Sequence, residues 1–408
     1  MKCLRIRPPA NPVHSRIQLP FSKSISARVL LIRAAGELST PIFHLSDSAD
    51  TVELQQALHQ VSEGLETIDA GNGGTSTRFL LSWLARRPGS YILDGGPQMR
   101  QRSIDPLVTA LQQAGASIIY LQQAGRLPVA VEGRPLTGGR LAVEASESSQ
   151  YVSSLLLQAP YFTRGLELEI SDQSVSLPYI EMTCRLMREF GVSVTRDSNL
   201  LQVEPGRYRG RPFTVEADWS AAAFPASLVA LQAGAVIELP GLSASFTQGD
   251  SMLVELFRIL GVQHRPSTNG LAFYNVAKEA NTFYANLSSY PDLFPALACT
   301  CAGLGIRARF SGIEHLRGKE SDRIAALGAE LGKMGVLMNK VAGDYTLEGK
   351  VAGGTCRINP HGDHRLAMAL ALLCIVTGEL IMEDPDCVNK SFPGYWKQLA
   401  LAGFVVEP

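Results

Sequence analysis

Hydrophobic and polar residues follow one repeating order along this chain. A stretch with helical spacing of apolar residues runs into a glycine and a small or apolar residue, and a segment of strict alternation follows. The glycines at these junctions are Gly115, Gly191, Gly261, Gly335 and Gly403, which lie 76, 70, 74 and 68 residues apart. The spacing predicts a structural unit of about 70 residues, of which the chain has room for six.

Each unit contains more strand than a simple strand–helix pair. Alternation predicts strands at Arg140–Glu144, Leu166–Ile170, Leu200–Val203 and Phe213–Glu216. This mixture favours an α/β fold with several sheet-and-helix units per domain over a doubly wound parallel sheet. The longest apolar run, Leu366–Val376, is too short to cross a bilayer and predicts a buried helix.

The composition excludes several classes of partner. The 408 residues are 46% hydrophobic and suffice for two domains with separate cores. A net charge of −1 provides no basic field for nucleic acid or an anionic membrane. The seven cysteines are scattered and odd in number, which is typical of reduced thiols, and the first residues lack the apolar core of a signal peptide. We therefore expect a cytoplasmic protein that binds small molecules.

Four short segments set cations beside hydroxyl or amide donors. They are Ser22–Arg28, Gly318–Arg323, Gly362–Arg365 and Asn389–Pro393. Lys and Arg with neutral donors can hold several phosphate and carboxylate oxygens at once. Glu320 and His364, which belong to two of these segments, could also move a proton. Together the segments indicate an active site for small polyanions.

Further polar motifs follow in a fixed order. They are Asp50-Thr51, Gly71–Arg78, Ser148–Gln150, Ser176–Tyr179, Gln248–Asp250 and Pro291-Asp292. With the four segments above, they resemble, motif by motif, the 5-enolpyruvylshikimate-3-phosphate synthase family of enolpyruvyl transferases. One such motif would be weak evidence, but ten in order over nearly the whole chain are specific.

The resemblance implies a fold and a division of labour. The family has a two-domain inside-out α/β barrel built from six βαβαββ repeats. Residues 21–217 would form an N-terminal domain that holds shikimate 3-phosphate, and residues 1–20 with 218–408 a C-terminal domain that holds phosphoenolpyruvate. The active site would lie in the cleft between them, with the hinge near Asp218. We expect a monomer that needs no cofactor and no metal.

The resemblance also implies a reaction. The enolpyruvyl group of phosphoenolpyruvate is transferred to the 5-hydroxyl of shikimate 3-phosphate, and phosphate is released by addition and then elimination. This is a step of chorismate and aromatic amino acid biosynthesis. Asp292 would take the hydroxyl proton, Glu320 would deliver a proton to C3 and later remove it, and Lys23 would stabilise the leaving phosphate.

The remaining site residues implied by the resemblance fall into groups. Those for phosphoenolpyruvate are Lys23, Arg323, Arg365 and Lys390. Those for the shikimate ring and its phosphate are Ser24, Arg28, Ser148, Ser149, Ser176 and Tyr179. A loop that lets backbone amides approach a phosphate contains Asn72, Gly74 and Thr75. The set is completed by Gln98, Gln150, Lys319 and His364.

Four positions depart from the family pattern. They are Phe21, Ala27, Phe79 and Gln98. Gln98 stands where the family has an arginine that contacts phosphoenolpyruvate. Losing this guanidinium should cost about 1.5 to 3 kcal/mol of binding unless Arg100 or Arg102 replaces it.

Several residues have simpler structural interpretations. Asp292 could be the N-cap of a helix over Leu293–Cys301. Glu320 and Arg323 could merely pair three residues apart on a helix. The segment His361–His364 has the look of a metal ligand set, but no further His or Cys cluster completes it, so a structural or anion-site histidine is favoured over zinc.

Two other functions are open. A transferase acting on UDP-N-acetylglucosamine shares fold and donor, but such enzymes resemble one another in a different opening and carry a loop cysteine that Gln98–Ile104 lacks. A non-catalytic relative is favoured only by the changes at Phe21, Ala27 and Gln98.

Overall fold

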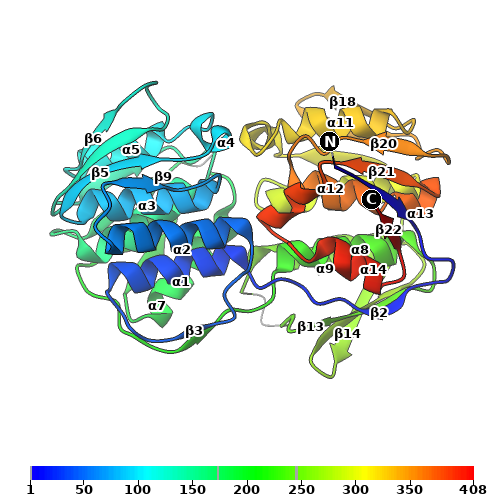
Figure 1. The fold of residues 1–408 in the computed structure, drawn as a ribbon, viewed down its shortest axis with the longest axis horizontal. Coiled ribbons are helices and arrows are strands. Elements are labelled where there is room, and N and C mark those ends of the chain that lie inside the picture. Colours follow the sequence, from blue (N-terminus) through cyan, green and yellow to red (C-terminus); the bar gives the residue numbers. More distant parts are fainter. Residues whose placement is uncertain (1, 172–173, 244–246) are drawn as a thin grey trace. The chain divides into compact units, whose positions relative to one another are not determined.

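The computed structural model describes residues 2–171, 174–243 and 247–408. The chain divides into two compact units, each mixing helices and strands (Figure 1). The N-terminal unit is Ser22–Val215, and the C-terminal unit is Glu216–Pro408 together with Met1–Phe21.

Sheets of one design recur in both units. The described part of the N-terminal unit has two four-stranded sheets. In the first sheet the strand order is β4 (Thr67–Asp69), β5 (Gly89–Asp94), β7 (Val129–Gly133), β6 (Ser117–Tyr120). In the second sheet the order is β8 (Gly139–Val143), β9 (Leu166–Ile170), β11 (Leu200–Val203), β10 (Val194–Asp197). It also pairs β3 (Ile42–Phe43) with β12 (Phe213–Thr214). In each four-stranded sheet the first two strands named are parallel and the other pairings are antiparallel.

The described part of the C-terminal unit has three sheets with the same pairing pattern. They are β2 (His14–Arg16), β13 (Val236–Pro240), β15 (Gly270–Asn275), β14 (Val262–Ser267); then β16 (Thr282–Asn286), β17 (Arg307–Ser311), β19 (Asp344–Glu348), β18 (Leu337–Val341); and β20 (Cys356–Ile358), β21 (Leu380–Glu383), β1 (Cys3–Arg7), β22 (Val405–Glu407). The first residues of the chain thus complete sheets made otherwise of its second half: β1 pairs with β21 and β22, and β2 with β13.

Three helices in each unit are buried on nearly every side. They are α1 (Lys23–Ala35), α3 (Gly74–Arg86) and α6 (Gln150–Gln158) in the N-terminal unit, and α8 (Trp219–Leu231), α10 (Phe294–Leu304) and α12 (His364–Ala371) in the C-terminal unit. Within each unit these core helices pack against one another. The sequences of α8 and α10 are apolar or small all round, as in α10 with FPALACTCAGL, whereas α1, α3, α6 and α12 also contain buried polar or charged residues.

Outer helices complete the repeats. They are α2 (Ala49–Ser62), α4 (Pro97–Arg100), α5 (Asp105–Gln113), α7 (Leu177–Glu189), α9 (Leu253–Ile259), α11 (Arg323–Gly332), α13 (Cys374–Thr377) and α14 (Tyr395–Leu401). Short 3₁₀ helices are η1 (Ala159–Tyr161), η2 (Gly249–Met252), η3 (Pro291–Leu293), η4 (Glu314–Gly318) and η5 (Pro385–Lys390). Helices alternate with strands in the order β4, α3, β5, α5, β6, β7, and this order returns with α6 and α7 and with α10 and α11.

The glycine junctions read from the sequence are real turns. All five adopt the left-handed conformation, with φ between 83° and 104°. Each follows an outer helix (α5, α7, α9, α11 or α14) and precedes a strand. A residue with a Cβ is strained at such a φ, which is why glycine marks each repeat.

Two predicted strands agree with the structure, whereas one predicted helix is interrupted. Leu166–Ile170 and Leu200–Val203 are strands as predicted, because buried apolar residues alternate with more exposed ones along each of them. Phe213–Glu216 is shorter, ending at Thr214. Leu366–Val376 is not one helix: α12 stops at Ala371, and the Leu373 N–H donates to Leu370 three residues back, so the turn tightens before α13.

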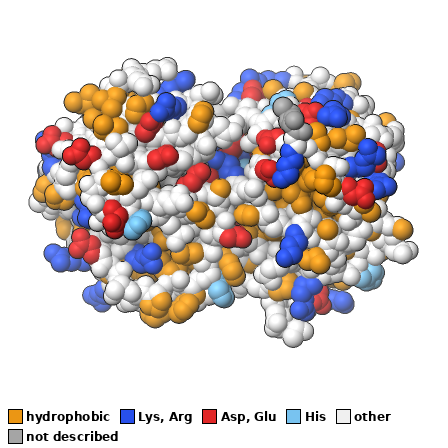
Figure 2. Space-filling view, in the orientation of Figure 1, with side chains coloured by type: hydrophobic (Ala, Val, Ile, Leu, Met, Phe, Trp, Pro, Cys, Tyr) orange, Lys and Arg blue, Asp and Glu red, His pale blue; other side chains and the backbone are white. Residues whose placement is uncertain are grey.

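Surface charge is mixed. On the face drawn in Figure 2, Lys and Arg side chains are interspersed with Asp and Glu, and no broad field of one sign is seen. Among the described residues, no helix combines the length and the hydropathy that a bilayer span requires.

Candidate active site

Most candidate residues lie where the core helices begin. Lys23 opens α1, Gly74 opens α3 and Gln150 opens α6. In the C-terminal unit, His364 opens α12. The first N–H groups of a helix lack intrahelical partners and carry partial positive charge, so these positions favour bound anions.

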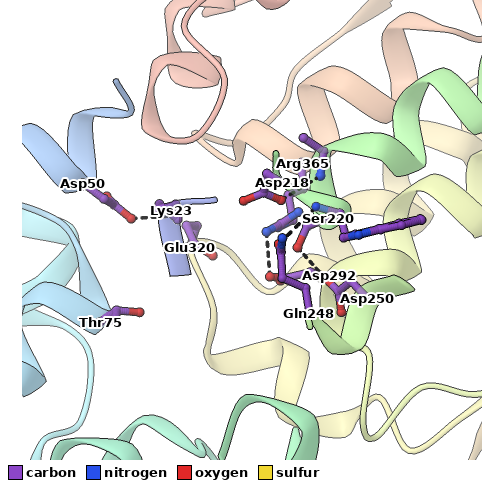
Figure 3. Close-up of polar contacts among 12 residues, drawn as sticks. Lys23, Asp50, Thr75, Asp218, Ser220, Gln248, Asp250, Asp292, Glu320 and Arg365 are labelled. Carbon is purple, nitrogen blue, oxygen red and sulfur yellow. Dashed lines mark hydrogen bonds and ion pairs between the residues drawn. The ribbon is translucent and has the colours of Figure 1, made fainter. Parts of the chain in front are cut away.

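Lys23 is paired with an acidic residue that the sequence analysis left without a role. Its Nζ lies 2.8 Å from Oδ2 of Asp50, in the first turn of α2 (Figure 3). The two side chains are only 18% and 9% exposed. Asp50 therefore holds the ammonium group at the start of α1 and offsets its charge.

Gln150 joins the starts of α3 and α6. Its Nε2 donates to Oγ1 of Thr75 at 2.9 Å, and its Oε1 accepts from Nη1 of Arg78. Arg78 also donates to the Ser103 carbonyl at 2.8 Å and stacks over the Tyr151 ring. Burial lowers the pKa of Arg78 to about 10, which leaves it cationic at neutral pH.

Arg28 is largely engaged by the protein. It is buried, and its guanidinium donates to the Ser24 and Tyr179 carbonyls and to the hydroxyls of Thr183 and Ser153. These four bonds use four of its five N–H groups. Burial lowers its pKa to about 10. Arg28 thus ties α1 to α6 and α7, and its assignment to the shikimate phosphate stays a prediction.

Arg100 and Arg102 are the two residues that could replace the guanidinium that Gln98 lacks, and their contacts distinguish them. The Gln98 N–H donates to Oδ1 of Asn72 at 3.2 Å, so Gln98 does reach the loop that contains Asn72. Arg100 is exposed and paired with both oxygens of Asp94. Arg102 instead lies against the start of α3: a Cβ built on Gly74 would stand 2.6 Å from its Nη1. Arg102 is therefore the cation beside Gly74.

Three serines lie close to helix starts in the same unit. Ser149 is the N-cap of α6, and Oγ of Ser148 accepts from the Gln150 N–H at 3.3 Å. Ser176 is the N-cap of α7 and adopts a left-handed conformation with φ of 58°. All three are buried. A non-glycine residue in this conformation is strained, which is common where a side chain has a functional position.

In the C-terminal unit, Arg323 joins three carboxylates. It is 1% exposed, and it donates to Glu320 Oε2 at 2.9 Å, to Asp363 Oδ2 at 2.8 Å and to Asp292 Oδ1 at 3.4 Å. Arg365 Nη2 donates to the other oxygen of Asp292 at 2.6 Å (Figure 3). We call these five residues the Arg323 cluster. It brings together Asp292, Glu320, Arg323 and Arg365, whose roles toward a substrate stay predictions.

The cluster sets the charge state of Asp292. Burial alone would raise the pKa of its carboxyl group, but Arg365, Arg323 and Lys319 together hold it below its ordinary value. Burial would lower the pKa of Arg323, yet Asp363, Glu320 and Asp292 raise it above its ordinary value. Asp292 and Arg323 are therefore both charged at neutral pH.

Two structural interpretations from the sequence are corrected. Leu293, not Asp292, is the N-cap of α10, because η3 precedes that helix. Glu320 and Arg323 do pair, but not along a helix: Asp322 caps α11 by accepting from the Ala325 N–H, so Glu320 lies in the turn before it. Glu320 is thereby placed toward Arg323 rather than on the helix surface.

Three further candidate residues of this unit, His364, Lys319 and Lys390, are buried or half-buried. His364 is buried at the start of α12. Lys319 is half-buried just after η4, and Lys390 is half-buried at the end of η5. Burial, and next to it the charge of Lys319, lower the pKa of His315 in η4 to about 3, so this imidazole is neutral. The described residues contain no group of three His, Cys, Asp or Glu side chains placed to hold a metal ion.

The motif Gln248–Asp250 supports the start of α8. Gln248 accepts from the Trp219 N–H at 3.1 Å and donates to the Ala217 carbonyl at 2.8 Å. Asp250 accepts from the Ser220 hydroxyl, and Asp218 caps α8 by accepting from the Ala221 N–H (Figure 3). These hydrogen bonds hold the first residues of α8 in place.

Sequence reasoning left several members of the site without a role. Asp50, Arg78 and Asp363 belong to quoted motifs but were given no function. Asp363, with 0% exposure, accepts from Arg323 and from the backbone N–H groups of Arg365 and Leu366, so it orders the start of α12. Their charge inside a polar motif was the available signal.

Comparison with known proteins gives one result throughout. The family described as EPSP synthase (3-phosphoshikimate 1-carboxyvinyltransferase) matches residues 61–399. A protein of Bacteroides fragilis named 3-phosphoshikimate 1-carboxyvinyltransferase is 40% identical over 400 residues, 97% of this chain and 97% of that protein. One of the same name from Methanosphaerula palustris is 35% identical over 420 residues, covering 97% of this chain and 98% of that protein.

A solved structure shares the fold. The EPSP synthase of Acinetobacter baumannii superposes with a TM-score of 0.80 over 100% of both chains, at 23% sequence identity. At this identity the likeness concerns the fold alone. The α/β fold class predicted from the sequence is confirmed.

Proposed function

The chain belongs to the EPSP synthase (3-phosphoshikimate 1-carboxyvinyltransferase) family, and from this premise we propose that it transfers the enolpyruvyl group of phosphoenolpyruvate to the 5-hydroxyl of shikimate 3-phosphate. The resemblance drawn from ten motifs and the transferase class are confirmed by the match. The product would serve chorismate and aromatic amino acid synthesis.

The observation that carries the proposal is the Arg323 cluster. A reaction on phosphoenolpyruvate needs cations for its carboxylate and two groups that move protons. Arg323 and Arg365 are guanidinium forks, and Asp292 and Glu320 contact them directly. One cluster thus supplies both requirements.

The proton steps follow from these positions. Asp292 accepts the hydroxyl proton as the hydroxyl oxygen bonds to C2 of phosphoenolpyruvate, and Glu320 donates a proton to C3. The tetrahedral adduct then expels phosphate, while Glu320 takes back a proton from C3. Lys23 offsets the charge of the leaving phosphate. Asp292 is well suited to be ionised at the outset because its pKa is lowered.

We assign the two units to the two substrates. Residues 21–217 would hold shikimate 3-phosphate through Ser24, Arg28, Ser148, Ser149, Ser176 and Tyr179. Residues 1–20 and 218–408 would hold phosphoenolpyruvate chiefly through Lys319, Arg323, His364, Arg365 and Lys390. The exceptions, for its phosphate, are Lys23 and the start of α3, which belong to residues 21–217. The buried serines near the starts of α6 and α7 support the first assignment.

Arg102, rather than Gln98, is proposed as the phosphate cation at the start of α3. Gly74 and Thr75 present helix N–H groups there, and the Arg102 guanidinium lies beside Gly74. Gln98 has no charge, and Arg100 is paired with Asp94. With Asn72 and Gln150 bordering the same loop, this group can receive the phosphate of phosphoenolpyruvate.

We further propose a cytoplasmic monomer without cofactor or metal. All seven cysteines are free thiols, as in a reducing compartment. Sedimentation should give the chain mass of 44.0 kDa at assay concentration. A stable species of twice that mass would contradict the monomer.

The first experiment measures phosphate release from phosphoenolpyruvate with and without shikimate 3-phosphate, and with no added metal. Release that requires shikimate 3-phosphate supports the proposal. UDP-N-acetylglucosamine is the matched second acceptor, and release only with that acceptor would assign the chain to the other transferase reaction. Release with neither acceptor would indicate a non-catalytic relative.

A further inference from the structure

We propose that Glu330 and His361 form a positioning pair that holds the segment leading into Asp363, His364 and Arg365. The inference rests on the proposed function, because it concerns the residues assigned there to phosphoenolpyruvate. Neither Glu330 nor His361 would touch the substrate.

Glu330 is a buried carboxylate with three donors. It is 2% exposed, near the end of α11. Its oxygens accept from His361 Nε2 at 3.0 Å, from the Asn359 N–H at 3.1 Å and from Lys333 Nζ at 2.6 Å. A buried carboxylate is stable only when its oxygens are so satisfied, and two of the three donors belong to the segment before α12.

That segment has an unusual backbone. His361 has φ of 54° and Gly362 has φ of 68°, so two successive residues are left-handed. Glycine adopts this conformation without strain, but histidine does not. The turn is held by three contacts: the His361 N–H donates to Asn359 Oδ1 at 2.7 Å, the Asp363 N–H donates to the Pro360 carbonyl, and the His361 ring bonds to Glu330.

Two residues of helix α11 bind the segment before α12. Arg323 and Glu330 are seven residues apart and so lie on one face of the helix. Arg323 binds the side chain of Asp363, and Glu330 binds Asn359 and His361. The turn at His361 lies between these two sets of contacts, so a shift of the turn would also move Asp363.

The position of Asp363 determines that of Arg365. The Asp363 carboxylate accepts from the Arg365 N–H at 2.9 Å, and the Arg365 guanidinium bonds to Asp292. A displaced His361 turn would move Asp363 and with it the start of α12. Because catalysis is sensitive to shifts of about 1 Å, the pair should affect the binding of phosphoenolpyruvate more than the overall fold.

The test compares variants that separate the anchor from the backbone strain. His361→Gly removes the ring but accepts the left-handed turn, and His361→Gln restores a donor at similar reach. We expect His361→Gly and Glu330→Gln to raise the KM for phosphoenolpyruvate about tenfold, with a smaller change in kcat. We expect His361→Gln to remain within about threefold of wild type.

Lys333→Gln is the matched control. It removes the third partner of Glu330 without touching the His361 turn, and Lys333 is 44% exposed. Its KM should stay at the wild-type value. The double variant Glu330→Gln with His361→Gly should be no worse than Glu330→Gln alone, because His361→Gly removes a bond that Glu330→Gln already weakens.

Backbone hydrogen exchange gives a readout that needs no activity. Glu330→Gln and His361→Gly should speed exchange at Arg365 and Leu366, whose N–H groups bond to Asp363. Unchanged exchange there and an unchanged KM, with only a lower Tm, would overturn the proposal. If the wild type released no phosphate at all, the proposed function would fail, and the exchange experiment would still decide the positioning role.

Discussion

The carboxylate of Asp292 accepts a hydrogen bond of 2.6 Å from the guanidinium of Arg365. The candidate base is therefore bonded to a candidate substrate-binding cation. Arg323 donates a hydrogen bond to the other oxygen of the same Asp292 carboxylate. The ion pair keeps Asp292 ionised, and a substrate carboxylate that draws the guanidinium groups toward itself would raise the basicity of Asp292. Binding and activation of the base are thus linked.

Asp292→Asn should abolish most of the turnover. The amide cannot accept a proton, so kcat for phosphate release should fall by roughly 10²- to 10⁴-fold, the usual contribution of a general base. Phosphate release with shikimate 3-phosphate is the measurement. A variant that kept more than a tenth of the wild-type kcat would show that another group removes the hydroxyl proton.

Asp292 should also make the folded state sensitive to acid. Its folded pKa is lowered, so its contribution to stability is complete above its ordinary value of 3.8 and is lost as the pH falls through the folded value. Wild type should therefore exceed Asp292→Asn in stability at pH 5 to 7, and the gap should close below about pH 4. Urea unfolding of both proteins across this range checks the sign. A gap that widened in acid would contradict a lowered pKa.

Arg102 should carry the anion-binding role that Gln98 lacks. Arg102→Gln should raise the KM for phosphoenolpyruvate by about 10- to 100-fold, since a charged hydrogen bond is worth about 1.5 to 3 kcal/mol. Arg100→Gln is the control, because Arg100 pairs with Asp94 at the surface. Gln98→Arg should lower the KM if a second fork helps. Equal effects of the two Arg→Gln variants would refute the assignment.

Gly74→Ala should act through Arg102. The new Cβ would lie 2.6 Å from Nη1 and 2.9 Å from Cζ of Arg102, so the guanidinium must move. We expect a raised KM for phosphoenolpyruvate and a small change in Tm, because the obstructed group is the end of a flexible side chain. Combining Gly74→Ala with Arg102→Gln should add little. Gly353→Ala, where a Cβ meets nothing within 4 Å, should leave the KM unchanged.

Gly335→Ala should lower stability through the backbone alone. Gly335 has φ of 85°, and a Cβ there would meet only the Lys350 carbonyl, at 3.9 Å. The expected loss in the free energy of unfolding is about 1 to 2 kcal/mol, the cost of a left-handed conformation for an L-residue. Gly332→Ala, three residues earlier in α11, meets nothing and should be neutral or slightly stabilising. Equal Tm values for the two variants would contradict this explanation.

The fold was predictable where its signals are local. The junction glycines and the alternation in Leu166–Ile170 depend on a few neighbouring residues, so they could be read directly. The pairing of β1 with β21 could not be read in this way, because it joins residues up to 380 positions apart, as in Cys3 opposite Glu383. The resemblance assigned residues 1–20 to the C-terminal domain but gave no strand pairing. The break between α12 and α13 was missed because an apolar run gives no sign of where a helix tightens.

The site was predictable as a set of charges but not as a set of contacts. Motif order identified Asp292, Glu320 and Arg323, which the structure brings together. It did not reveal that Arg28 is occupied by neutral acceptors or that Arg102, not Arg100, faces Gly74. Such contacts depend on segments that meet only after folding, and the assignments of individual residues to substrates stay predictions.

The place of β1 has a consequence for synthesis. Its residues Arg5 and Ile6 pair with β21 on one side and with β22, close to residue 408, on the other (Figure 1). During synthesis β1 must therefore wait for β22, which lies about 400 residues later in the sequence, before its sheet can close. Nothing comparable delays the N-terminal unit, whose described strands pair among themselves before residue 216. The two units should consequently mature at different times, the N-terminal unit first and the C-terminal unit only after β22 has been synthesised.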